Sequence, residues 1–166
     1  MLKHTVSVTS SQRDVAITPA FRARLKRAVK KTLLQREYPH PCFVQVSVVS
    51  SEEIRRLNRE FRDKDSSTDV LSFPALEDVN SPTAADMDLS RGGEVFLGDV
   101  ILCAEVIRDQ AGDFSHSFEE ECVYMTVHSV LHLLGFDHVK ERERIEMFKL
   151  QDGIYKIIDE EEKNEK

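Results

Sequence analysis

The feature of this sequence that most constrains its fold is a group of three closely spaced histidines. The segment reads His128-Ser-Val-Leu-His132-Leu-Leu-Gly135-Phe-Asp-His138, and apolar residues accompany it at helical spacing. Residues four apart on an α-helix share a face, so His128 and His132 are predicted to point the same way. Gly135 suits the left-handed position that ends many helices. The chain is therefore predicted to turn at Gly135 and to bring His138 to the other two histidines.

Three converging imidazoles predict an open metal site at the C-terminus of a helix. Three protein ligands leave one tetrahedral position free, which is typical of a catalytic rather than a structural zinc site. One zinc ion per chain is expected, although nickel, copper and iron also bind imidazole. A lone histidine is more often a core or capping residue. Here three of the six histidines fall within one short segment, and this clustering favours metal binding.

The rest of the chain predicts an α+β fold around this site. Strands are predicted at 4–9, 42–49, 69–73 and 94–102, and helices from Pro19, at 51–61, and at about 103–111, 117–134 and 139–158. This order indicates a single metallohydrolase-like domain at 1–158, with a four-stranded mixed sheet packed with about five helices. Residues 159–166 are mostly Glu and Lys and are predicted to be an acidic disordered tail. The pattern leaves the strand order open.

Composition and cysteine usage exclude several classes of protein. The 166 residues suffice for one domain, and no apolar run approaches the ~18 residues that a membrane span needs. The N-terminal segment alternates polar and apolar residues, unlike the apolar stretch of a signal peptide. The three cysteines form no CxxC pair and are expected to be reduced thiols. We therefore expect a cytoplasmic protein with no membrane association.

The charge of the chain is divided unevenly between its two halves. The net charge is −7, yet residues 1–75 carry 14 Lys/Arg and 8 Asp/Glu, a net of +6, and the remainder carries −13. Such asymmetry can indicate an anionic partner on one face. It can equally reflect two faces that are solvated differently. The sequence leaves both interpretations open.

The histidine spacing is shared with a class of zinc peptidases, the metzincins. In those enzymes a glutamate directly follows the first histidine and acts as the general base. Ser129 occupies that position here, and a serine hydroxyl cannot accept a proton in this way at neutral pH. A zinc peptidase that lacks its usual base is therefore a weaker alternative.

A second segment places three basic residues, Arg59, Arg62 and Lys64, between a predicted helix and a predicted strand. One interpretation is a charged surface turn, in which Arg62 pairs with a neighbouring aspartate. The other is an anion-binding site, since the guanidinium group offers a fixed fork of donors that fits a phosphate.

With these segments the sequence resembles the bacterial YbeY family of metal-dependent endoribonucleases and ribosomal RNA maturation factors. The residues that carry the resemblance are Asn58 through Pro74, Leu97-Gly98-Asp99-Val100 and His128 through His138. The resemblance implies that His128, His132 and His138 are zinc ligands and that Arg62 is a functionally important, catalytic arginine. It also implies that the protein cleaves single-stranded RNA in 16S rRNA 3′-end maturation and takes part in ribosome quality control.

The same resemblance implies ribosomal RNA and the small ribosomal subunit as partners. An RNA-facing surface is then expected on the basic N-terminal half, with Arg22, Lys26, Lys30, Arg59 and Arg62 as candidates. Because phosphate neutralisation releases counterions, RNA binding is expected to weaken with salt. The sequence leaves open the oligomeric state, the cleavage position and any protein partners.

The sequence departs from the family pattern at two positions. Ser129 stands where the family usually has glycine, and Ser67 stands where it usually has proline. Serine is small and compatible with a helix, so the metal site is expected to survive the first change. Serine at position 67 is expected to loosen the turn before Thr68, so that Arg62 is held less firmly.

The predicted chemistry lacks an evident general base. Arg62 is expected to stabilise the charge that develops on the phosphate. The base could be hydroxide on the metal, or Asp69 or Asp137 acting through water. The lack of an obvious base keeps one further alternative open, a non-catalytic ribosome-associated binding protein with a structural metal.

Overall fold

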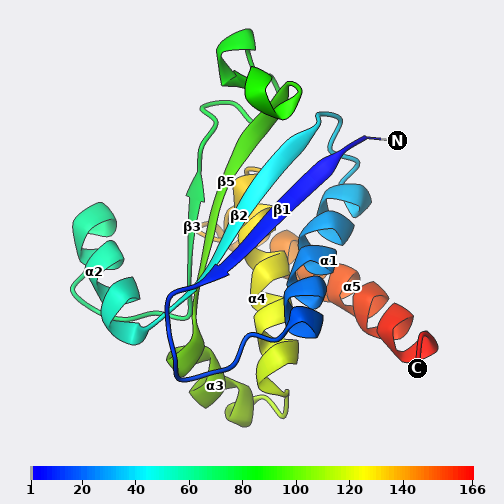
Figure 1. The fold of residues 1–166 in the computed structure, drawn as a ribbon. Helices are drawn as coiled ribbons and strands as arrows, with labels where there is room; N and C mark the ends of the chain where they lie inside the picture. The colour runs from blue at the N-terminus through cyan, green and yellow to red at the C-terminus, as the bar shows by residue number, and fades with distance from the viewer. Residues whose placement is uncertain (1) are drawn as a thin grey trace.

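The computed structural model describes residues 2–166 as one α+β domain (Figure 1). The elements are β1 His4–Ser10, α1 Pro19–Gln35, β2 Cys42–Val49, α2 Ser51–Arg62, β3 Val70–Pro74, β4 Met87–Asp88, β5 Glu94–Cys103, α3 Ala104–Asp113, α4 Phe118–Leu133 and α5 Glu141–Asn164. The predicted fold class, the five helices and the four long strands are confirmed. Among residues 2–166, no helix combines the length and the apolar character needed to cross a membrane.

The sheet is mixed, and its long strands lie in the order β1-β2-β5-β3. β1, β2 and β5 run parallel, and β3 lies at the edge, antiparallel to β5. The two-residue strand β4 also pairs with β5 and was not predicted. It lies between two short 3-10 helices in the region after β3 that the sequence pattern left without structure.

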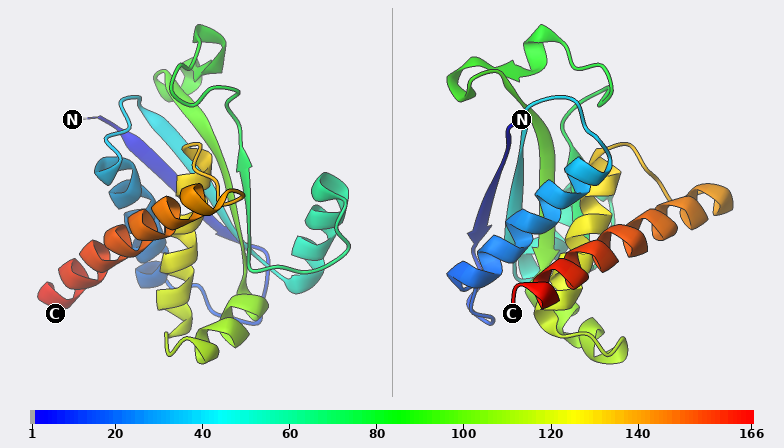
Figure 2. Two further views of the ribbon diagram at one scale, coloured as in Figure 1. Left: turned by 180° about the vertical axis from the view of Figure 1, so that it is seen from behind. Right: turned by 90° about the vertical axis from the view of Figure 1, so that its right-hand side faces the viewer.

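The helices divide between the two faces of the sheet (Figures 1 and 2). Buried side chains of α1 and α4 pack on the face that carries Val44, Val46 and Val48 of β2. α5 packs on the far side of α4 through a second apolar cluster. α2 covers part of the opposite face, where Ile54 meets Leu71. α4 therefore lies between the sheet and α5, so its position is determined from two sides.

Capping residues determine where three of the helices begin. Thr18 Oγ1 accepts from the Phe21 backbone N–H at 3.1 Å, directly before Pro19, as the sequence predicted. Ser50 caps α2 in the same way. At the start of α4, Ser117 and Glu120 exchange hydrogen bonds in a capping box. These short-range signals make the helix starts readable from the sequence.

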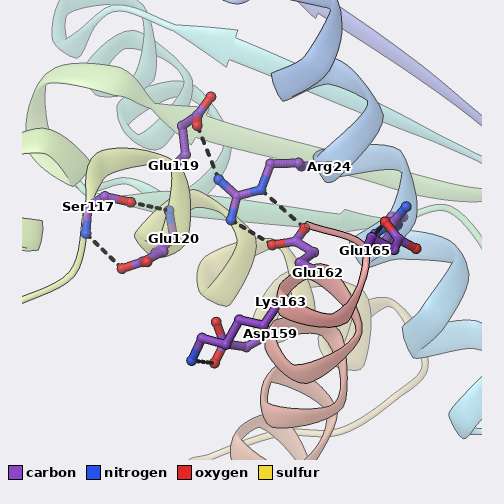
Figure 3. A network of polar contacts seen from close by, with 9 residues as sticks. Arg24, Ser117, Glu119, Glu120, Asp159, Glu162, Lys163 and Glu165 are labelled. Carbon is purple, nitrogen blue, oxygen red and sulfur yellow. Dashed lines mark hydrogen bonds and ion pairs between the residues drawn. The ribbon is translucent and has the colours of Figure 1, made fainter.

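The prediction of a disordered tail at 159–166 was wrong, because α5 continues to Asn164. Its last turns lie against α1, and Figure 3 shows the contacts around Arg24. The ion pairs are Arg24–Glu162 at 2.8 Å, Lys31–Glu161 at 2.8 Å and Arg27–Glu165 at 2.9 Å. Within residues 159–166 considered alone, the glutamates repel one another. The basic residues that balance them lie on α1, more than 120 positions earlier in the chain.

Candidate metal centre

α4 ends in the turn that the sequence predicted at Gly135. Gly135 has φ 95°, in the left-handed region. Its N–H donates to the His132 carbonyl at 3.0 Å, and the Phe136 N–H donates to the Leu131 carbonyl at 3.0 Å. These two bonds make up a Schellman motif, which satisfies carbonyls that the helix end would otherwise leave unpaired. The chain then reverses and carries His138 back to the end of α4.

The structure brings the three histidine side chains together. Their ring centroids are 4.7 Å apart for His128 and His132, 5.0 Å for His132 and His138, and 5.6 Å for His128 and His138. One ring nitrogen from each lies within 4.8 Å of the others. His128 Nε2 and His132 Nε2 are 3.2 Å apart. Two nitrogens held about 2.0–2.1 Å from a tetrahedral zinc ion would be roughly 3.3 Å apart, so the spacing of the His128 and His132 nitrogens fits such an ion.

Burial keeps two of these imidazoles in the neutral form that binds metals. Removal from water lowers the pKa of His128. It also lowers the pKa of His132 to about 4, and the neighbouring histidines His128 and His138 add to this effect. Both rings are therefore neutral at neutral pH in the metal-free protein. A neutral ring offers a nitrogen lone pair without first having to lose a proton.

A buried glutamine, Gln151 of α5, fixes the orientation and tautomer of His128. His128 Nδ1 lies 2.9 Å from Gln151 Oε1, and Gln151 Nε2 donates to the Tyr124 carbonyl at 3.2 Å. The second bond assigns the amide nitrogen, so the amide oxygen faces His128 and accepts a hydrogen bond from Nδ1. The lone pair of His128 is therefore on Nε2, toward His132. Such partners commonly orient metal-binding histidines in proteins.

The sequence analysis missed Gln151, although a signal was present. Met147, Gln151, Ile154 and Ile158 recur at the spacing of one helix face, and all four are buried. A single glutamine in an otherwise apolar stripe needs a hydrogen-bonding partner. The spacing does not reveal that this partner is His128, which lies 23 positions earlier in the chain.

Arg62, the last residue of α2, is held against the edge strand of the sheet. Its Nη2 donates to the Ser72 carbonyl of β3 at 3.1 Å, and its guanidinium carbon lies 5.9 Å from the centre of the Phe73 ring. Within residues 2–166 it forms no ion pair, and Asp65 pairs with Arg55 instead. The pairing with a neighbouring aspartate that the surface-turn interpretation assumed is therefore not present in the described part of the chain. Its charge is not neutralised by a carboxylate, while its position is fixed.

The loop after α2 is held by Asn58 despite the serine at position 67. Asn58 is buried, and its Nδ2 donates to the Ser66 carbonyl at 2.9 Å. The Asn58 carbonyl accepts from the Lys64 N–H at 3.2 Å. Ser67 itself is exposed. These bonds supply a local restraint on the turn, at the point where the departure from the family pattern predicted loosening.

The histidines and Arg62 line one cleft with a volume of about 780 Å³. Its lining also includes Asn58, Lys64, Ser66 through Ser72, Pro74 and Gly135 through Val139. Both carboxylates considered as general bases are among these residues. Asp69 Oδ1 accepts from the Val70 N–H at 2.8 Å, and Asp137 Oδ1 accepts from the His138 N–H at 2.7 Å. One oxygen of each carboxylate is thus engaged by the backbone beside it.

The basic residues of α1 do not line this cleft. Lys26 and Lys30 lie along a separate shallow hollow on α1, and Arg22 donates to the Val8 carbonyl. α1 and α2 lie on different sides of the sheet (Figure 1). The positive charge of the N-terminal half is therefore distributed over two surfaces. Of the RNA-facing candidates named above, the structure places only Arg62 in the cleft with the histidines.

Glycine at position 98 allows the edge strand and the end of α4 to approach β5. Gly98 has φ 147°, and a Cβ there would lie 2.4 Å from the Phe73 carbonyl oxygen and 2.8 Å from Leu133 Cδ2. Any larger residue would displace β3 or α4. Since β3 holds Arg62 and α4 carries two of the histidines, Gly98 helps to set the distance between them.

A hydrogen bond between two serines connects the histidine helix to the strand that holds Arg62. Ser129 of α4 and Ser72 of β3 are both buried, and their Oγ atoms are 2.6 Å apart. A glycine at position 129, the residue that the family resemblance leads one to expect there, could not form this bond. Ser129, which departs from the family pattern, therefore adds a hydrogen bond between α4 and β3.

Replacing Ser129 with alanine is expected to destabilise the fold by about 1–2 kcal/mol, because the Ser72 hydroxyl loses its buried partner. Adding Ser72→Ala should cost less than the sum of the two single changes, since the double variant leaves no unpaired hydroxyl. Urea unfolding of the four proteins measures this coupling, and the exposed Ser7→Ala serves as a control. Strictly additive free energies would show that the bond contributes nothing.

Comparison with known proteins assigns the chain to a family. The family model described as Endoribonuclease YbeY matches residues 7–159. A Clostridium botulinum protein named Endoribonuclease YbeY is 33% identical over 165 residues, which cover 93% of this chain and 98% of that protein. A protein of the same name from Caldanaerobacter subterraneus subsp. tengcongensis is 46% identical over 123 residues, covering 74% and 77% of the two chains.

The fold has a counterpart among solved structures. The solution structure of TM1509 from Thermotoga maritima aligns with a TM-score of 0.59 and 26% sequence identity. The alignment covers 96% of this chain and 93% of that protein. The family match therefore extends over the strands, the helices and the cleft described above, and the chain belongs to the YbeY endoribonuclease family.

Proposed function

We propose that this protein is a metal-dependent endoribonuclease that cleaves single-stranded RNA. The observation that carries the proposal is the single cleft in which the three-histidine cluster and an arginine free of carboxylate partners lie together. Phosphodiester hydrolysis needs an activated water molecule and positive charge near the phosphate. A divalent metal on His128, His132 and His138 would act as a Lewis acid toward a phosphoryl oxygen and would activate water.

The protein's own groups supply binding and orientation. Arg62 has guanidinium N–H groups left over beyond the one that Ser72 accepts, and these can bind phosphate oxygens. Its anchorage on β3 positions the positive charge before the substrate arrives, so little reorganisation is needed as negative charge develops. Lys64 adds a second cation to the same side of the cleft. Asp69 and Asp137 line the same cleft and are the carboxylate candidates for accepting a proton from water.

The biological role that we propose rests on family membership. The relatives are named as endoribonucleases, and we infer action on ribosomal RNA, in 16S rRNA 3′-end maturation and ribosome quality control. The partners would be ribosomal RNA and the small subunit, in the cytoplasm where ribosomes are assembled. The metal would be zinc, whose tetrahedral preference suits three imidazoles and one open position.

The proposal is tested with rigorously purified protein that is first stripped of metal and then reloaded with zinc. We expect zinc-dependent internal cleavage of single-stranded RNA, with little cleavage of the same sequence in a duplex. A His132→Ala protein taken through the same purification controls for contaminating ribonucleases. Equal cleavage by the two preparations, or no cleavage by the zinc-loaded protein, would refute the enzymatic proposal.

Absence of cleavage by the zinc-loaded protein would favour the non-catalytic alternative, a ribosome-associated binding protein with a structural metal. One observation supports this alternative. One carboxylate oxygen of Asp69 and one of Asp137 already accept a hydrogen bond from the adjacent backbone N–H. The peptidase alternative has no such support. Ser129, at the position of the peptidase base, is buried and bonded to Ser72, and it does not line the cleft.

A further inference from the structure

Exposed apolar side chains adjoin the histidine cluster on the side of α5. Val139, in the turn between α4 and α5, is 80% exposed and lines the cleft. On the first turns of α5, Ile145 is 61% exposed and Phe148 is 40% exposed. The centre of the Phe148 ring lies 6.0 Å from that of His128. An aromatic ring is thus left open to solvent directly beside a candidate metal ligand.

The orientation of Phe148 is determined by its own helix. Residues three apart on a helix are neighbours, so Phe148 adjoins Gln151 on one side and Ile145 on the other, and the last two lie about 120° apart around α5. Gln151 bonds to His128, so its face of α5 is turned toward the histidines. Residues 135–139 line the cleft together with residues 70–72 of β3, and the left view of Figure 2 shows α2 on the other side of β3. The cleft therefore has Arg62 and Lys64 at its α2 end and the apolar Val139 at the other, and Phe148 lies outside the lining, beside His128.

This division matches the two chemical parts of a nucleotide in a single strand. The phosphate is an anion and fits Arg62 and Lys64, whereas an unpaired base presents an apolar face. Base stacking on aromatic side chains is the common way in which proteins bind single-stranded RNA. In a duplex that face is already stacked within the helix and is closed to the protein. Basic side chains alone would bind single-stranded and double-stranded RNA alike.

We propose that Phe148, flanked by Val139 and Ile145, is the subsite for an unpaired nucleobase next to the phosphate that the histidines and Arg62 engage. This subsite selects single-stranded over double-stranded RNA. The inference rests on the proposed ribonuclease function and adds the group that recognises the strand state of its substrate. Phe148 binds and positions the base, and takes no part in the chemical step.

The test compares Phe148→Ala with Phe148→Trp in the full-length, zinc-loaded protein. Loss of one stacked base should raise KM for a short single-stranded oligoribonucleotide about 5- to 100-fold, with a smaller change in kcat. Phe148→Trp should retain the wild-type KM, since the larger ring also stacks. The matched control is Phe114→Ala at the end of α3, which removes a ring that is 63% exposed and, unlike that of Phe148, does not lie against His128.

Phe148→Trp also gives a direct reading of stacking, because the chain contains no tryptophan. Its fluorescence should be quenched by the oligoribonucleotide, and the quenching should fall when one position of that RNA is made abasic. Equal quenching by every abasic RNA would overturn the subsite, as would a Phe148→Ala protein that matches Phe114→Ala. Wild-type protein that neither binds nor cleaves RNA would instead overturn the proposed function, and the subsite with it.

Discussion

Replacing His132 with alanine is expected to reduce the bound metal from about one ion per chain to nearly none. His132 lies between the other two imidazoles, with ring centres 4.7 Å from His128 and 5.0 Å from His138. Two remaining ligands no longer meet the three-ligand minimum of a catalytic zinc site. Because a metal ion contributes several kcal/mol to such reactions, RNA turnover should fall by about three orders of magnitude or more. Elemental analysis and RNA cleavage on the same preparation measure both effects.

A matched control for this substitution is His40→Ala. The His40 ring packs edge-to-face with the Tyr38 ring and lies outside the histidine cluster. The His40→Ala variant should therefore keep its full metal content. Circular dichroism should show that His132→Ala remains folded, since α4 is held by apolar contacts on two sides. A folded His132→Ala protein with one ion per chain would exclude these histidines as the metal site.

Replacing Arg62 with alanine is expected to lower RNA turnover by one to three orders of magnitude while metal content stays unchanged. This is roughly the range seen when one charge-stabilising donor is removed from an active site. Arg62→Lys should recover only part of the activity, because an ammonium group cannot reproduce the guanidinium fork that both binds Ser72 and faces the cleft. Metal content, melting temperature and RNA cleavage are measured together on the two variants.

Arg59→Ala provides the control for general loss of positive charge. Arg59 lies on the same helix, is exposed, and is 3.8 Å from Asp65, a contact expected to contribute little. Its replacement should leave turnover within a few-fold of wild type. Normal cleavage by Arg62→Ala would remove Arg62 from the mechanism. An equal loss in Arg59→Ala would assign the effect to the charge of α2 rather than to the position of Arg62.

The features that sequence reasoning predicted correctly are those fixed within one or two helical turns. Thr18-Pro19 marks the start of α1, and Gly135 marks the end of α4. The spacing of His128 and His132 places them on one face whatever surrounds the helix. Alternation identified β1, and β-prone runs identified β2, β3 and β5, without reference to their neighbours. Each of these signals depends only on backbone geometry and on adjacent side chains.

The disordered-tail prediction failed because it considered only local charge. The glutamates after position 159 repel one another in an isolated segment, and only the fold brings Arg24, Arg27 and Lys31 of α1 against them. The N-terminal charge excess likewise did not reveal where its basic residues lie. Its basic residues lie on α1 and α2, on separate surfaces, and several of them are already paired.

By itself the sequence determined the start of α1, the end of α4, the four long strands and the shared face of His128 and His132, because these follow from backbone conformation over a few residues. Only the tertiary structure decided how the cleft is built. The strand order puts β3 at the sheet edge, where Ser72 holds both Arg62 and Ser129. The packing of α5 on α4 delivers Gln151 to His128. These contacts join residues from 10 to 57 positions apart, and their formation depends on how the apolar faces of the helices and the sheet pack together.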